Sequence, residues 1–116
     1  MRSLPDPATL RAAWWALRAV TAARSELRTR PFESVVVAAP PSLPGHAVRG
    51  VHAVLRRREP TCLERSLVLQ RWLAAHGDPR DVIIGVLAPA AGFGAHAWLE
   101  GERPSSPFRE LTRVAP

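Results

Sequence analysis

Cys62 is the single cysteine of the chain, and its place in the sequence favours a nucleophile. It lies between Thr61 and Glu64 in a T-x-x-E pattern, which predicts that Thr61 caps a helix that begins at Cys62. Free backbone N–H groups and the positive end of the helix dipole stabilise a thiolate there. His96 lies on a later predicted strand, so the chain order suits a Cys–His pair. A lone cysteine is also commonly a small apolar core residue, and the spacing alone leaves both interpretations open.

The residues around Cys62 and His96 form a longer pattern. It consists of a helix start, a helix-ending glycine, a short apolar strand and the histidine strand: Cys62–Leu67, then Leu73 and Gly77, then Ile84–Val86, then Ala95–Glu100. In order, spacing and residue type, this pattern resembles the leader peptidases of lasso peptide biosynthesis. That family has the chemistry of transglutaminase-like, or papain-like, cysteine proteases. The resemblance covers about residues 61–100, and the preceding helices are compatible with it but unspecific.

The resemblance implies a reaction and a set of partners. Cys62 would attack a backbone carbonyl in the leader of a lasso peptide precursor, and His96 would act as base and then protonate the leaving amine. The expected partners are the precursor, a small leader-recognition protein and an ATP-dependent cyclase that closes the macrolactam ring. Because a papain-like core uses all 116 residues, we expect the recognition protein to be a separate chain. Two rival interpretations are transglutaminase-type acyl transfer to an amine and a catalytically weakened, basic peptide-binding module.

The third member of the catalytic set is where the chain departs from the family. The family places an aspartate about a dozen residues beyond the histidine, and here no aspartate follows His96. A tight hairpin at residues 101–102 would set the return strand beside His96, with proline and serine side chains as its neighbours. The nearest carboxylate further along is Glu110. We therefore predict that Glu110 orients His96, with Ser106 as the alternative; orientation by a backbone carbonyl and a weakened enzyme also stay open.

Three further features admit two interpretations each. Arg65 is either a substrate contact or a solvated side chain near the helix start. Trp98 shares a strand face with His96; we favour a core residue over a shield for the imidazole. Arg56–Arg58 either guide an acidic leader peptide or form a solvated helix end.

Composition and charge limit the class of protein. A hydrophobic content of 47% excludes a disordered chain, and one cysteine excludes a disulfide framework or a multi-cysteine zinc site. All 16 basic residues are arginine; against ten acidic residues they give a net charge of +6, which favours acidic partners. His46 and His52 are spaced wrongly for a shared metal. We expect no cofactor, no metal, no nucleic acid, no membrane span and a cytoplasmic location.

The elements that must position Cys62 and His96 follow from periodicity and breakers. Helices are predicted from Ala8 to about Arg28, over residues 45–58, and from Cys62 to a stop at Gly77; strands are predicted at Asp81–Ala88, at Ala95–Glu100 and from Arg103 onward. Residues 34–39 are either a brief strand or a buried connector. Helices followed by an antiparallel meander predict one α+β domain of papain-like type over residues 1–116, with a helical part at about 7–58 and a catalytic core at about 60–116.

The first helix has a predicted inner face. Leu10, Trp14, Leu17 and Thr21 recur at helical spacing, which places Trp14 toward the core and Trp15 away from it.

Overall fold

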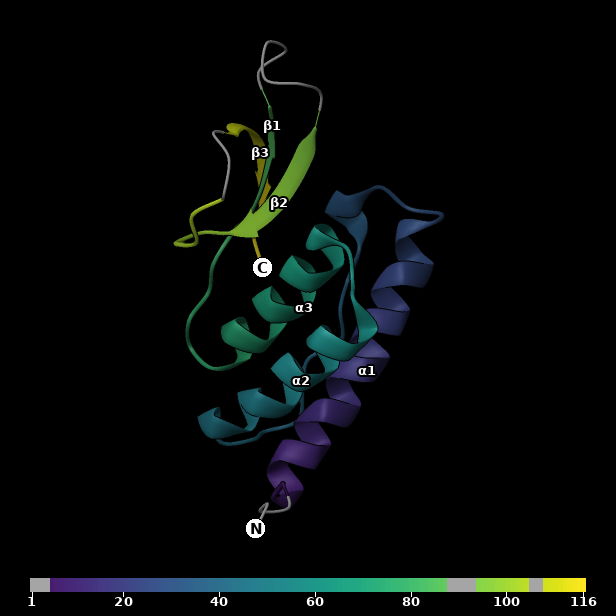
Figure 1. Ribbon diagram of the computed structural model, residues 1–116, viewed down its shortest axis with the longest axis vertical. Coiled ribbons are helices and arrows are strands. Elements are labelled where there is room, and N and C mark those ends of the chain that lie inside the picture. Colours follow the sequence, from purple (N-terminus) through teal and green to yellow (C-terminus); the bar gives the residue numbers. More distant parts are fainter. Residues whose placement is uncertain (1–4, 88–93, 105–107) are drawn as a thin grey trace.

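The computed structural model describes residues 5–87, 94–104 and 108–116. Within them, three α-helices come first along the chain and three strands come last. The two groups lie at opposite ends of an elongated molecule of 50 × 33 × 26 Å (Figure 1). This arrangement confirms the predicted α+β class. None of the helices in the described part combines the length and apolar character needed to span a bilayer.

Helix α1 (Pro7–Leu27) starts as the sequence predicts, with the Asp6 carboxylate accepting a hydrogen bond from Thr9 N at 2.8 Å. Its predicted inner face is wrong, because Trp14 is 61% exposed while Trp15 is 8% exposed. The buried face consists of small residues around one tryptophan: Ala12, Trp15, Ala16, Ala19, Val20 and Ala23. The indole N–H of Trp15 donates to Ala38 O at 3.0 Å, so burial leaves its one donor satisfied.

Helix α2 (Val48–Arg58) follows a short 3-10 turn, η2 (Gly45–Ala47), and crosses α1 at very close range. A Cβ atom added to Gly50 would lie 2.2 Å from Thr9 O, so the two backbones are in direct contact. Another 3-10 turn, η1 (Phe32–Ser34), precedes the segment at residues 35–41. The structure assigns no strand there, and Val37 is buried, so this segment is the connector of the two predicted alternatives.

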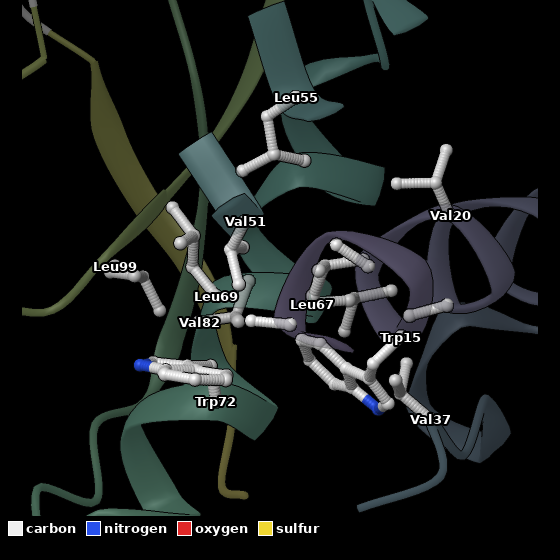
Figure 2. Close-up of a cluster of buried hydrophobic side chains, with 14 of the residues drawn as sticks. Trp15, Val20, Val37, Val51, Leu55, Leu67, Leu69, Trp72, Val82 and Leu99 are labelled. Carbon is white, nitrogen blue, oxygen red and sulfur yellow. The ribbon is translucent and has the colours of Figure 1, made fainter. Parts of the chain in front are cut away.

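Helix α3 (Cys62–Ala75) lies between the sheet and the other helices (Figure 1). Figure 2 shows its Leu67, Leu69 and Trp72 within one apolar cluster that also includes Trp15 of α1 and Val82 of the sheet. Nearly the whole helix is therefore surrounded, as its sequence predicts. The predicted stop is also confirmed, because Gly77 has a φ of +76°, a conformation that favours glycine.

The sheet consists of β1 (Val82–Val86), β2 (Ala95–Leu99) and β3 (Arg109–Val114), paired antiparallel in the order β2-β1-β3. The predicted hairpin between the histidine strand and the return strand is therefore wrong. The outer edge of β2 is already occupied: Ala97 N donates to Cys62 Sγ at 3.4 Å and Leu99 N to Glu102 Oε1 at 2.9 Å. The return strand instead pairs with the free edge of β1.

The two faces of the sheet have different surroundings. The inner face, which carries Val82, Ile84, Ala97 and Leu99, belongs to the main apolar cluster with α3. Because side chains alternate along a strand, His96 and Trp98 lie on the outer face. Cys62 and His96 thus lie near each other at the edge of β2.

Candidate active site

Cys62 is the first residue of α3, and the predicted capping box fixes its backbone. Glu64 N donates to Thr61 Oγ1 at 3.2 Å, and Thr61 N donates to Glu64 Oε1 at 3.0 Å. Within this described turn, the amides of Cys62 and Leu63 have no hydrogen-bond partner and point out of the helix start. The half-buried Sγ accepts its hydrogen bond from Ala97 N. The sulfur thus lies at the start of α3 and is bound by a backbone N–H of β2.

Arg24 of α1 stabilises this turn through two contacts. Its Nε lies 3.0 Å from Glu64 Oε1, and one of its terminal nitrogens donates to Arg58 O at 2.7 Å. The carboxylate of Glu64 is buried, so this ion pair is partly shielded from solvent. One arginine thus holds the end of α2 and the start of α3 together.

Cys62 and His96 line one cleft of about 350 Å³ at the edge of β2. In the contacts of the described residues, Sγ accepts a hydrogen bond from the Ala97 amide, and none joins Sγ to the imidazole. Catalytic hydrogen bonds are often long in a free enzyme and shorten when substrate binds. The cleft places the two side chains for such a rearrangement, and Arg65, Trp98 and Glu102 form its walls.

Aromatic rings hold the imidazole from the other side. The ring centroid of His96 lies 5.2 Å from that of Phe108 and 5.9 Å from that of Trp98, and both pairs are stacked. Trp98 is only 9% exposed, yet it lies outside the main apolar cluster. Trp98 is therefore a buried residue that also stacks beside the imidazole, and the structure is consistent with both interpretations of this side chain.

Arg65 and Glu102 close the cleft with an ion pair at 3.3 Å. Burial acts to raise the pKa of Glu102, but the hydrogen bond from Leu99 N, followed by the Arg65 guanidinium, outweighs it and leaves that pKa below its usual value. Arg65 is paired in the free protein rather than fully solvated, and because it lines the cleft, the predicted substrate contact stays a prediction. Arg65 ties α3 to the turn that follows β2.

A model of the transglutaminase-like superfamily matches residues 6–113. The chain belongs to this superfamily. No curated protein and no solved structure matches the chain significantly. Transglutaminase-like domains are often cysteine-dependent enzymes and include cysteine proteases and acyltransferases. A cysteine at the start of a central helix, next to a histidine strand, agrees with that membership.

In this transglutaminase-like domain, the structure does not bring Glu110 to His96. Gly85 of β1 lies opposite both residues, so their backbones are about 10 Å apart, twice the usual strand spacing. The ring of Trp98 occupies the space above Gly85, where an added Cβ would lie 2.7 Å from Trp98 Cη2. The Glu110 carboxylate binds the Arg113 guanidinium at 2.8 and 2.9 Å.

The alternative third member, Ser106, lies outside the described residues, as do the nearest neighbours of the predicted hairpin. In the part of the chain that the structure does describe, no hydrogen bond reaches the His96 imidazole, and no three His, Cys, Asp or Glu side chains cluster as metal ligands. His46 instead binds Asp6, and His76 stacks on Trp72.

Sequence reasoning missed three contributors to the site: the backbone amide of Ala97, the ring of Phe108 and the brace by Arg24. The first two depend on how the strands pair, which local patterns do not reveal. A signal existed for Arg24, because a buried capping-box glutamate needs a positive or donor partner. Arg24 is one of several arginines on the predicted first helix, however, and the sequence does not single it out.

Proposed function

We propose that this transglutaminase-like domain is a cysteine peptidase that removes the leader peptide from a lasso peptide precursor. The observation that carries the proposal is the shared cleft of Cys62 and His96, with the cysteine at the start of a capped helix. The finer assignment is supported by the pattern over residues 61–100, which resembles lasso leader peptidases in order, spacing and residue type.

The reaction would proceed through a thioester. The Cys62 thiolate attacks the scissile carbonyl carbon, and the C–S bond forms while negative charge moves to the carbonyl oxygen. The free amide of Cys62 lies at the helix start, where it can donate to that oxygen. The C–N bond then breaks, and His96 gives the departing amine its proton. Water, activated by His96, attacks the thioester and releases the leader carboxylate and the thiol.

The peptidase would work with other proteins in the cytoplasm, where a free thiol stays reduced. A separate leader-recognition protein would present the precursor, and an ATP-dependent cyclase would use the freed amine to close the macrolactam ring. Because positioning contributes strongly to rate, cleavage by this chain alone should be slow and should accelerate when the recognition protein is added. Full-rate cleavage without that partner would show that the chain recognises its own substrate.

The decisive experiment incubates the protein with a lasso precursor peptide, which is to be sought among the genes beside this one. Cys62→Ala and His96→Ala should each abolish leader cleavage, by at least about a thousandfold, with the fold intact by circular dichroism. His52→Ala is the matched control, because this exposed histidine lies on α2 outside the cleft, and it should cleave normally. Mass spectrometry follows the products.

The same spectra separate the rival functions. Hydrolysis leaves a free carboxylate on the leader, whereas acyl transfer in the presence of an added amine leaves the mass of the amide adduct. Complete cleavage by Cys62→Ala would end the cysteine-peptidase proposal. Peptide binding by the wild-type chain without any turnover would favour the binding module.

A further inference from the structure

A groove of about 940 Å³ lies between α1 and α2, away from the side chains that line the catalytic cleft. Its apolar part includes Leu10, Leu17 and Val54, and Leu10 is 56% exposed. Its basic part consists of Arg49 and Arg56–Arg58, all exposed. An exposed apolar strip beside arginines is the composition of a surface that binds an amphipathic, acidic chain.

The arginines of this groove have no acidic partners in the described part of the chain. The acidic side chain that lines the groove, Asp6, is already engaged by Thr9 and by His46. The hydrogen bonds from Thr9, and then that from His46, lower the pKa of Asp6 to about 2, so it stays a carboxylate bound to its own neighbours. The positive charge of the groove is therefore left for an external anion.

The basic end of the groove adjoins the catalytic helix. Helix α2 ends at Arg58 and α3 begins at Cys62, and Arg24 bonds both sides of that junction. Partial burial, and then the charges of Arg65 and Arg56, hold the pKa of His52 below its usual value. Arg65 of the cleft and Arg56 of the groove therefore both lie near His52.

We infer that the groove between α1 and α2 binds an acidic segment of the same peptide that Cys62 cleaves. Carboxylates of the peptide pair with the arginines, and its aliphatic side chains cover Leu10, Leu17 and Val54. The identity of the peptide rests on the proposed function. A nucleic acid fits less well, since the described residues that line the groove include no Trp, Tyr or Phe ring on which a base could stack.

The test measures binding apart from cleavage. The inactive Cys62→Ala chain is titrated into a fluorescein-labelled peptide of alternating Glu and Leu, and anisotropy is recorded at low salt. Adding Arg56→Glu and Arg57→Glu should weaken binding at least about tenfold, because like charges then face each other. The matched control, Arg28→Glu with Arg109→Glu, makes the same change in net charge at exposed sites outside the groove and should weaken binding about twofold or less.

Three results would overturn the inference: equal weakening by the control pair, equal binding of a peptide with Gln in place of Glu, or displacement of the peptide by an oligonucleotide of the same charge at equal concentration. Leu10→Asn should also weaken binding, and no change there would contradict the apolar half of the groove. In the active chain, the groove variants should raise KM for the precursor and leave kcat unchanged. If Cys62→Ala abolishes cleavage and the groove variants leave it unaffected, the peptidase proposal stands and the groove inference is wrong.

Discussion

The helical end of the molecule and its sheet end satisfy their charged groups in opposite ways. At the sheet, Arg113 contacts Asp81, Glu100 and Glu110, and Arg65 contacts Glu102. On α1 and α2, most exposed arginines that the structure describes have no carboxylate partner, as in the groove. The sheet end uses its charges to fix its own geometry, whereas the arginines of the helical end are available to the acidic peptide that we propose.

The two ends also differ in how they pack. Most residues of the main apolar cluster come from the helices, where small side chains let α1 and α2 touch. Strand β3 has no buried side chain among its residues, and the outer face of the sheet carries a few stacked rings. Changes at the helical end should therefore affect stability, and changes on the outer sheet face should affect the rate.

Gly50→Ala should have the largest effect, and it tests the helical end. The added Cβ would lie 2.2 Å from Thr9 O, a backbone atom that moves only if α1 and α2 separate. We expect a loss of about 3 kcal/mol in the free energy of unfolding, measured by urea titration. Gly45→Ala is the matched control, since its Cβ meets nothing within 4 Å, and it should stay within about 1 kcal/mol. Equal losses of unfolding free energy in the two variants would mean that the close contact between α1 and α2 does not determine stability.

Gly85→Ala tests close packing at the sheet end in the same way. Its Cβ would lie 2.7 Å from Trp98 Cη2 and 2.8 Å from Arg109 O, so the indole must shift against His96. A displacement of about 1 Å in a catalytic group lowers rates by about a hundredfold, and we expect that fall in kcat. Gly94→Ala is the control, because its Cβ meets only a flexible Leu87 side chain at 3.1 Å. An unchanged kcat in Gly85→Ala would remove Trp98 from the positioning of the imidazole.

The two ends also differ in how much of their structure the sequence could predict. Caps, stops and the element order follow from local chemistry, and the capping box alone places Cys62 correctly. Strand pairing does not follow, because the choice between two edges depends on what already occupies them. Here the Cys62 sulfur and the Glu102 carboxylate occupy the β2 edge. The prediction of the inner face of α1 was wrong for a related reason. Close contact with α2 selects small residues for that face rather than the largest ones.

Glu102→Gln should have a smaller effect on the same end. The amide keeps an acceptor for Leu99 N but loses the charge that holds Arg65, so we expect kcat/KM to fall about tenfold. Glu100→Gln is the matched control, because that exposed carboxylate contacts Arg113 outside the cleft. The pKa of Glu102 is lowered in the folded protein, so its stabilising effect is present above the ordinary glutamate value and is lost as pH falls through the lower one.

The pH dependence separates a charge effect from a shape effect. The difference in unfolding free energy between wild type and Glu102→Gln should be at most about 1 kcal/mol near neutral pH, because the pair is partly exposed. It should shrink as Glu102 becomes protonated in acid. A difference that is constant with pH would contradict the ion pair as its source.

Glu110→Gln should have the smallest effect, and it decides how the imidazole is oriented. The sequence predicts Glu110 as the orienting group, but its carboxylate binds Arg113, and the Trp98 ring lies over the glycine between it and His96. If this arrangement persists with substrate, single-turnover cleavage should slow less than about threefold, below 0.7 kcal/mol of barrier at about 1.36 kcal/mol per decade. A loss of one decade or more would make Glu110 the third catalytic group and require the Trp98 ring to move on binding.

Ser106→Ala tests Ser106 as the alternative orienting group. If neither variant slows cleavage, the enzyme works as a Cys–His dyad whose imidazole is held by Trp98 and Phe108.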